Sequence, residues 1–409
     1  MSATAYDAVI LGAGPAGATA ALLLARAGWH VAIVEQSRFP RRKVCGEFLS
    51  ATTWPLLHAL GVADAYRAMA GPAVRRTGLY EADTDIAAPL PGSNDTTGAG
   101  RALGREHLDT LLLSAAVAAG AHCFQPWRAV ALERVDEDWR CALASQDGTQ
   151  TLCARRIILA TGSWQRSPLF DPSAMPHRDA DLFGFKAHFT NSTLPDGLMP
   201  LLVFPGGYGG MVHSDSGRVS ISLCIRRDAL RGLRVTYPGH AGEAVIAHAM
   251  QSCRAVARAL AQAELQGRVL SAGPIRPGFR ACYRDGIFAI GNSAGEAHPI
   301  IAEGIGMAMQ SAWLLCRRLI AESGAAPDMA AIGAAYRRDW HRHFALRIHT
   351  AAVLANLALR PSLHGLPRLL LRRAPRLLSL CARLSGKVHH LPPSGLSIAE
   401  AVHSAPFTK

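Results

Sequence analysis

The sequence predicts an α/β fold in which a parallel sheet carries an inserted antiparallel sheet and the chain ends in a helical segment. Three observations lead to this prediction. The chain begins with a strand, a glycine-rich turn, a helix and a second strand. A middle segment alternates apolar and polar residues with a period of two, and the chain becomes rich in leucine and arginine from residue 351 onward.

The N-terminal segment has the order strand, G-x-G-x-x-G, helix, strand, acid. Residues 7–11 form a short apolar run of the buried parallel-strand type, and residues 30–34 form a second one. The glycine motif and an alanine-rich helix that ends near residue 27 lie between them. In this context the motif predicts a Rossmann-like dinucleotide-binding unit.

Each glycine of that motif has a physical role. Gly12 allows the tight turn, Gly14 lets a pyrophosphate approach the backbone, and Gly17 lets the helix pack closely on the strand. The helix N-terminus offers free N–H groups to the phosphates. Glu35 follows the second strand and is expected to accept hydrogen bonds from the adenosine ribose hydroxyls.

Two later segments resemble the FAD-dependent aromatic hydroxylase superfamily, which includes flavin halogenases and geranylgeranyl reductases. One is Ala160-Thr161-Gly162 at the end of a strand. The other is G-N-S-A-G-E-A-H-P at residues 291–299, where the superfamily carries G-D-A-A-H-x-x-x-P, followed by a helix that begins at Gly304. The resemblance covers residues 6 to about 320 and implies bound FAD, with the helix N-terminus near Gly304 facing the flavin N1–C2=O edge.

Two departures from the superfamily pattern bear on function. Asn292 stands where the family has the Asp that contacts the ribityl chain; an amide can still bond a ribityl hydroxyl. The segment at residues 160–162 reads A-T-G because Thr161 is its middle residue. The hydroxylases carry A-D-G there, a motif that is associated with docking both FAD and NADPH. NADPH or NADH and a separate electron donor therefore both stay open.

Residues 43–47, K-V-C-G-E, resemble the C-G-E loop of the reductase and halogenase branches, which lies beside the flavin. The resemblance implies that Arg42 or Lys43 lies near the ribose or pyrophosphate. Cys45 and Glu47 become catalytic candidates, against the alternatives of an ordinary buried thiol and a surface cap. His298, immediately before Pro299, would lie on the flavin loop and is the third candidate.

The complete site prediction combines these segments with Arg105, which begins a stretch resembling the family's R-x-x-L-D helix start. The catalytic candidates are His298, Glu47 and Cys45. The residues expected to bind the cofactor are Gly12, Gly14, Pro15, Ala16, Gly17, Glu35, Arg42, Lys43, Arg105, Gly162, Gly291, Asn292, Pro299, Gly304 and Ile305. No metal site is predicted.

The middle of the chain predicts an antiparallel sheet that covers the flavin. In residues 181–189, Phe183, Phe185, Ala187 and Phe189 share one face, and Gly184, Lys186 and His188 share the other. Further strands are expected in residues 78–90, 201–204, 211–213 and 218–226. His188 and His213 are possible bases for a phenol, although a strand histidine more commonly faces solvent.

The last segment predicts short helices that restart at Pro367 and Pro375. Residues 354–409 contain eight Lys or Arg and one Glu, a balance typical of basic helices that lie on an anionic membrane. A helical cap on the FAD domain is the alternative.

The elements give the following domain boundaries. A discontinuous FAD-binding domain is expected at residues 1–75, 100–178 and 275–322, a substrate-binding sheet domain at 76–99 and 179–274, and a helical basic region at 323–409.

Composition excludes several classes of protein. With 49% apolar and 18% charged residues, the 409-residue chain is not intrinsically disordered and can bury a large core. The net charge of +13 favours anionic ligands or membrane surfaces. The basic residues are not clustered with aromatic ones on a recognised module, so no nucleic-acid partner is expected.

The nine cysteines are scattered without a C-x-x-C pair, as is usual in a reducing compartment. Residues 1–7 lack Lys and Arg, so the apolar stretch after them does not resemble a secretory signal. The expected location is the cytoplasm, with peripheral contact to the inner membrane face left open.

The function that the resemblance implies is a monooxygenase that hydroxylates a hydrophobic aromatic or polyketide-type metabolite through a flavin C4a-hydroperoxide. The alternative is a reductase of isoprenoid double bonds similar to the geranylgeranyl reductases, which the C-G-E loop and the A-T-G turn favour. Residues 207–210, G-Y-G-G, resemble part of the aromatic substrate motif of those reductases. A halogenase, which would carry W-x-W-x-I-P, and a non-redox prenyl-binding protein like the Rab GDP-dissociation inhibitors are less favoured.

Overall fold

The computed structural model describes residues 5–91, 93, 98–163, 176–237, 239–322 and 328–385. Its first layer is a six-stranded sheet in the order β20-β21-β12-β2-β3-β8. The strands are β2 (Ala8–Leu11), β3 (Val31–Val34), β8 (His122–Phe124), β12 (Ile157–Leu159), β20 (Tyr283–Arg284) and β21 (Ile287–Ala289). All pairings are parallel except β20 with β21. β2, β3 and β12 are buried along their whole length, as continuous apolar runs in a parallel sheet require.

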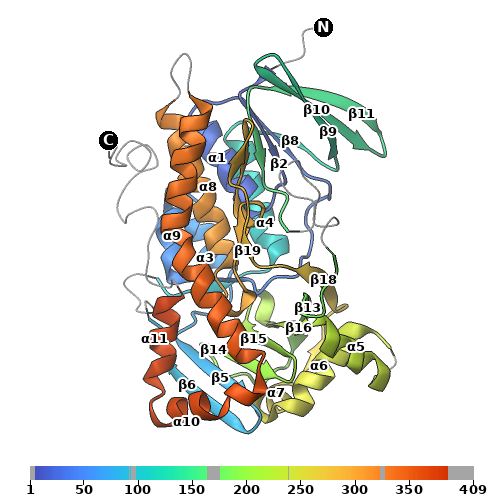
Figure 1. Ribbon diagram of the computed structural model, residues 1–409, viewed down its shortest axis with the longest axis vertical. Coiled ribbons are helices and arrows are strands. Elements are labelled where there is room, and N and C mark those ends of the chain that lie inside the picture. Colours follow the sequence, from blue (N-terminus) through green and yellow to red (C-terminus); the bar gives the residue numbers. More distant parts are fainter. Residues whose placement is uncertain are drawn as a thin grey trace.

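Helices cover this sheet. α1 (Pro15–Arg26) packs between α4 (Arg105–Ala118) and α8 (Gly304–Ala321), and α9 (Met329–Ala358) packs against α8. The side chain of Asp328 caps α9 by accepting hydrogen bonds from the N–H groups of Ala330 and Ala331. The 30-residue α9 runs along the molecule from the parallel sheet to the second large sheet (Figure 1).

The second large sheet has eight strands in the order β17-β13-β16-β15-β14-β5-β6, with β18 also paired to β13. Its strands are β5 (Arg76–Glu81), β6 (Thr84–Pro89), β13 (Leu182–Thr190), β14 (Leu198–Phe204), β15 (Gly207–His213), β16 (Val219–Arg226), β17 (Glu264–Leu265) and β18 (Leu270–Ile275). These strands lie in residues 76–89 and 182–275. β14 and β5 are parallel, whereas the other pairings are antiparallel.

Helices cover both faces of this sheet. One face, with Tyr80, Leu202 and Leu223, packs on α6 (Ala241–Ser252) and α7 (Arg254–Leu260), which follow α5 (Arg227–Thr236). The opposite face, with Leu79 and Val203, packs on the C-terminal end of α9 and on α10 (Gly365–Arg373) and α11 (Arg376–Leu384). Figure 1 shows α10 and α11 beside β5 and β6.

Smaller elements complete the fold. A four-stranded sheet has the order β1-β11-β10-β9, from β1 (Ala5–Tyr6), β9 (Arg128–Val135), β10 (Asp138–Ser145) and β11 (Gly148–Ala154). Two short pairs join β4 (Phe48–Leu49) to β7 (Arg101–Ala102) and β19 (Gly278–Phe279) to β22 (Gly295–Glu296). Helices α2 (Trp54–Ala59) and α3 (Ala63–Met69) follow β4.

The period of two in residues 181–189 predicts a strand with one buried face. This expectation is wrong, because both faces of β13 are buried. Phe185, Ala187 and Phe189 are buried on one face of β13, as the alternation predicts, but Lys186 and His188 on the other face are only 1% and 2% exposed. The second face is covered because the loop that carries Glu47 packs against it.

Candidate functional site

One continuous cavity of about 930 Å³ joins the glycine-rich loop after β2 to the space under α10 and α11. Sixteen of the residues singled out from the sequence line it: Gly12, Gly14, Pro15, Ala16, Glu35, Lys43, Cys45, Glu47, Arg105, Gly162, Gly291, Asn292, His298, Pro299, Gly304 and Ile305. The remaining two do not. Gly17 lies inside the helix–strand contact, and the Arg42 side chain is 38% exposed and pairs with Glu106.

The glycine loop leaves room for a ligand at one position only. A Cβ on Gly17 would lie 1.8 Å from the carbonyl oxygen of Gly12, and a Cβ on Gly12 (φ 107°) would lie 2.5 Å from that of Ala160. These two glycines are therefore required by the protein's own packing. A Cβ on Gly14 would meet only the Arg105 guanidinium at 3.5 Å, so the absence of a side chain there opens space toward the cavity. α1 begins at this point without a side-chain cap.

Glu35 is held rigidly at the end of β3. Its carboxylate accepts hydrogen bonds from the N–H groups of Ala13 (3.1 Å) and Ser37 (3.0 Å) and pairs with Arg41 at 3.3 Å. The Glu35 carboxylate is therefore hydrogen-bonded to the glycine loop at Ala13 and ion-paired with the side chain of Arg41.

Three basic side chains line the same end of the cavity: Arg41, Lys43 and Arg105. Arg105 is fixed by two hydrogen bonds to Asp109, at 2.6 and 2.7 Å, and Arg41 pairs with Asp109 at 2.9 Å. Burial, reinforced by the charges of Arg41 and Arg105, lowers the pKa of Lys43 to about 8. Arg41 is not among the residues expected from the sequence. In residues 41–43 the exposure alternates, so that Arg42 is turned outward and Arg41 and Lys43 are partly buried.

The loop between β21 and α8 closes over the A-T-G turn. The Ser293 hydroxyl accepts a hydrogen bond from the Gly162 N–H at 3.2 Å, and the Ser311 hydroxyl accepts one from the Gly291 N–H at 2.7 Å. α8 then begins at Gly304 without a side-chain cap, where an added Cβ would meet nothing within 4 Å. The N-terminus of α8 is thus open to the cavity.

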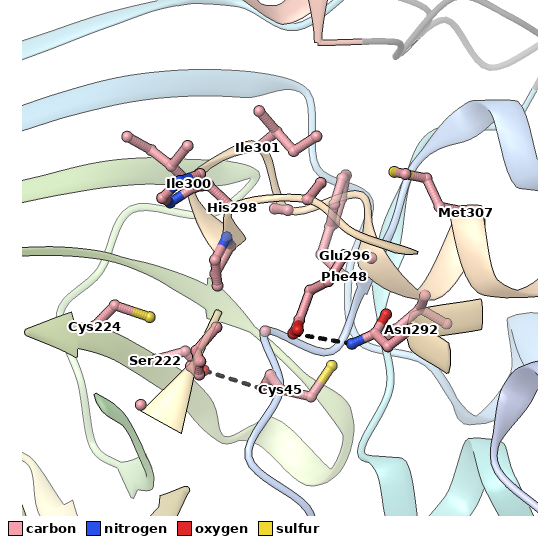
Figure 2. A pocket seen from close by; sticks show the side chains of 18 of the residues that line it. Cys45, Phe48, Ser222, Cys224, Asn292, Glu296, His298, Ile300, Ile301 and Met307 are labelled. Carbon is pink, nitrogen blue, oxygen red and sulfur yellow. Dashed lines mark hydrogen bonds between the residues drawn. The ribbon is translucent and has the colours of Figure 1, made fainter. Parts of the chain in front are cut away.

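Asn292 and Glu296 form a pair on this loop, as Figure 2 shows. The Asn292 amide donates to Glu296 Oε1 and to the Ser163 hydroxyl, both at 3.0 Å. Burial raises the pKa of Glu296, and the salt bridge with Arg280 opposes that shift. An amide is suited to this place because it can donate to a buried carboxylate, whereas a second carboxylate would repel it.

Glu47 is held in a buried polar network. Its side chain is fully buried and accepts hydrogen bonds from the Lys186 ammonium, from His188 Nε2 (2.9 Å) and from the Ser214 hydroxyl (3.2 Å). Burial alone would raise the pKa of Glu47, but the bonds from His188 and the charge of Lys186 outweigh it and hold the pKa well below its usual range. The carboxylate is therefore not a surface cap, and it is hydrogen-bonded to all three of these side chains.

Cys45 and His298 do face the cavity. Cys45 is partly buried, and its carbonyl accepts a hydrogen bond from Ser222 of β16 (Figure 2). His298 Nδ1 lies 3.5 Å from the hydroxyl of Tyr208, which extends from β15 and is 1% exposed. Burial lowers the pKa of His298 to about 4, so its imidazole is neutral at pH 7.

Beyond His298 the cavity becomes apolar. The face of the sheet that contains Leu79 forms one wall, and α9, α10 and α11 form the other. The apolar side chains of this part are those of Leu79, Met199, Leu201, Val203, Ile275, Ile300, Ile301, Leu354, Leu357, Leu370, Leu371, Leu377, Leu378, Leu380 and Leu384.

Known proteins are similar to this chain in sequence and in architecture. Residues 5–171 match the family model of the FAD binding domain. The chain is 28% identical over 347 residues to digeranylgeranylglycerophospholipid reductase 2 of Methanopyrus kandleri, covering 78% of this chain and 77% of that protein. The N-terminal part of the chain is therefore similar to the FAD binding domain of flavin-dependent oxidoreductases. The structure of the myxobacterial chondrochloren halogenase CndH matches 98% of this chain and 96% of its own, with a TM-score of 0.76 and 18% identity.

Menaquinone reductase of Mycobacterium tuberculosis is 33% identical over 167 residues, which is 40% of this chain. The match covers 38% of that reductase, so this flavoprotein chain aligns with well under half the length of the first curated relatives.

The described residues fit FAD. The open position at Gly14, the uncapped start of α1 and the three basic side chains suit a pyrophosphate. Glu35 lies where the ribose of a dinucleotide is bound in this fold, and the open N-terminus of α8 suits the negative edge of a reduced flavin.

Lys43 is expected to make FAD binding dependent on pH. Its ammonium form attracts phosphate, and with a pKa of about 8 it loses its proton as the pH rises through that value. We expect FAD affinity to fall between pH 7 and 9, and Lys43→Met to bind FAD about tenfold more weakly at pH 7 with a flatter profile. Flavin fluorescence titration measures both. Arg42→Met is the matched control because that side chain is outside the cavity; an equal effect of Arg42→Met would refute the assignment.

Asn292→Asp places a second carboxylate beside Glu296. Because two close carboxylates raise the pKa of one of them, the folded state then binds more protons than the unfolded state, and stability falls as the pH rises. We expect the variant to lose about 1–3 kcal/mol of unfolding free energy at pH 8 and less at pH 5. Chemical denaturation at both values tests this. The double variant Asn292→Asp/Glu296→Gln again has one amide and one carboxylate at these two positions, and it should recover most of the lost unfolding free energy. If it is as unstable at pH 8 as Asn292→Asp alone, the pairing of residues 292 and 296 is contradicted.

Proposed function

We propose that the protein is an FAD-dependent monooxygenase that hydroxylates a phenol bearing a long apolar tail, with NADPH or NADH as the electron donor. One observation carries the proposal. The cavity combines a neutral histidine and a tyrosine at its flavin end with a long apolar part beyond them. This distribution fits an amphiphile with a hydroxylated ring at one end.

We assign to His298 the role of binding the hydroxyl group of the phenol. With Nδ1 directed to Tyr208, its Nε2 can accept a hydrogen bond from the phenol hydroxyl, which makes the ring richer in electrons. Bound FAD, once reduced, supplies the activation of molecular oxygen. One oxygen atom enters the ring in place of a hydrogen, and the other leaves as water with the two electrons of the reduced nicotinamide.

The apolar walls give the reaction its selectivity. Leucine and isoleucine side chains from the sheet and from α9 to α11 exclude water from the ring and bury the tail. Each buried methylene contributes about 0.8 kcal/mol, so a long-chain phenol should bind far more tightly than phenol itself.

A reductase of isoprenoid double bonds is the second candidate. The similarity to a digeranylgeranylglycerophospholipid reductase over 347 residues favours it, as do the C-G-E loop and the A-T-G turn. The same apolar part of the cavity would hold a prenyl chain. The two reactions differ in the fate of oxygen, which a hydroxylase consumes and a reductase does not.

The testing experiment incubates the purified yellow protein with NADPH or NADH and 3-pentadecylphenol in air. Product formation is followed by mass spectrometry and oxygen consumption by an electrode. We expect a product heavier by one oxygen atom, and much weaker turnover of phenol. Reduction of geranylgeraniol without air, with no hydroxylated product in air, would replace this proposal by the second candidate.

His298→Ala is expected to lower kcat/KM for 3-pentadecylphenol by about 10–100-fold, because the phenol hydroxyl loses its hydrogen-bond acceptor. The wild-type rate should also fall as the pH drops toward about 4, where the imidazole gains a proton. His298→Gln keeps a polar side chain of similar reach and should retain more activity than the alanine variant. Equal kcat/KM in wild type and His298→Ala would remove His298 from the mechanism.

A further inference from the structure

The helix pair α10 and α11 carries an unusual concentration of exposed apolar side chains. Six leucines between residues 363 and 384 are 37–51% exposed: Leu363, Leu369, Leu370, Leu377, Leu380 and Leu384. They are six of the fourteen large apolar side chains exposed in the part of the chain that the structure describes. We call this set, with the exposed arginines between them, the α10–α11 surface. Exposed apolar residues gathered in one place mark an interaction site.

The charge of this surface is uniformly positive. The sequence contains no Asp or Glu from residue 340 to residue 385, and eight arginines lie in that stretch. The exposed arginines on or beside α10 and α11 are Arg360, Arg372, Arg373, Arg376 and Arg383. The structure gives none of these five an ion pair with a carboxylate of the described residues, and Arg372 donates instead to the Thr84 hydroxyl at 2.9 Å. The surface thus offers cations to an external partner.

The same helices form a wall of the cavity. Leu370, Leu377, Leu380 and Leu384 line the cavity and are also exposed on the outside, so a single layer of helix separates the apolar cavity from the exterior there. Polar contacts hold this layer to β5 and β6. Ser379 donates to the carbonyl of Pro89 at 2.7 Å, and His364 Nδ1 lies 2.6 Å from Glu81 Oε1.

An anionic bilayer fits these features better than a protein does. A second copy would bring the same uncompensated arginines face to face, which repels. A bilayer with anionic headgroups offers negative charge to the arginines and an acyl boundary to the leucines at the same depth. The described part of the chain contains no helix with both the length and the apolar character of a bilayer span, so binding would be peripheral.

We propose that the α10–α11 surface docks on an anionic membrane and that the cavity loads its apolar substrate from the bilayer through this wall. The docking step depends on the surface alone. The loading step rests on the proposed function, because only a substrate with a long tail resides in the bilayer.

The docking test sediments the FAD-loaded full chain with vesicles of phosphatidylcholine alone or mixed with phosphatidylglycerol, without substrate. We expect binding to the mixed vesicles that weakens as salt rises. Leu369→Ser/Arg373→Ser should weaken that binding by about tenfold or more, because it removes an apolar and a basic contact that do not line the cavity. Arg234→Ser/Val235→Ser on α5, where Val235 is 84% exposed, is the matched control and should bind as the wild type does.

Three results would overturn docking: no sedimentation with mixed vesicles, equal loss in both double variants, or self-association that Leu369→Ser/Arg373→Ser abolishes while vesicles remain unbound. Loading is tested by turnover of 3-pentadecylphenol delivered in the two kinds of vesicle. Faster turnover from mixed vesicles supports it, and equal turnover from both overturns it. If vesicles bind but the phenol is not hydroxylated in detergent either, the proposed function fails while docking stands.

Discussion

Replacing Lys186 with Met is expected to lower the free energy of unfolding by about 3–5 kcal/mol, because it leaves the fully buried carboxylate of Glu47 without its main countercharge. The substitution should also disturb the cavity, because the loop that carries Glu47 lines it. Glu47 has a positive φ of 62°, uncommon for a residue with a side chain, and the network with Lys186 and His188 holds its loop, which also carries Cys45. Denaturant unfolding monitored by circular dichroism measures the loss.

The pH dependence separates this network from simple packing. Because the pKa of Glu47 is depressed in the folded state, its contribution is present above the unfolded pKa of about 4.3 and is lost as the pH falls below it. The wild type should therefore lose stability between about pH 5 and pH 3, and Lys186→Met should lose less over that range. Glu47→Gln/Lys186→Met removes both charges and should be more stable than Lys186→Met; a double variant that is less stable would contradict the assignment.

Gly14→Ala is expected to weaken FAD binding by about 10–100-fold, equivalent to about 1–3 kcal/mol of crowding against the pyrophosphate. The apoprotein should keep its stability, since the new methyl group would meet only the flexible Arg105 side chain at 3.5 Å. Gly17→Ala should behave differently, because its Cβ would lie 1.8 Å from a backbone oxygen and would damage the fold itself.

Gly232→Ala on α5 is the matched control for Gly14→Ala. A Cβ there would meet nothing within 4 Å, and the residue does not line the cavity. Flavin fluorescence titration and thermal unfolding of the apoproteins give the two readouts. Wild-type FAD affinity in Gly14→Ala would show that the pyrophosphate does not approach this glycine.

The local parts of the fold could be predicted from the sequence. The run of β2, glycine turn, α1 and β3 is set by neighbouring residues, and its expected limits agree closely with the structure. The strand that contains Phe185 was found from its period of two, and the helix restarts at Pro367 and Pro375 match α10 and α11. In each case the signal lies in residues that are neighbours along the chain.

The parts that depend on distant partners could not be predicted. Lys186 and Glu47 are 139 residues apart, so no local pattern shows that the second face of β13 is buried. The same holds for the wall that α10 and α11 add to the cavity, since an amphipathic helix is compatible with either a membrane or a protein face. His298 could be predicted only in part. The motif indicates its position on the flavin loop, but its neutral state follows from burial, which the motif does not show.

The most direct test of the account is a single turnover of the reduced flavoprotein with 3-pentadecylphenol and ¹⁸O₂. The protein is first reduced without oxygen by NADPH, and the product is then analysed by mass spectrometry. The account predicts a phenol that contains one ¹⁸O atom for each NADPH oxidised. An unchanged phenol, with the electrons recovered as hydrogen peroxide, would contradict it.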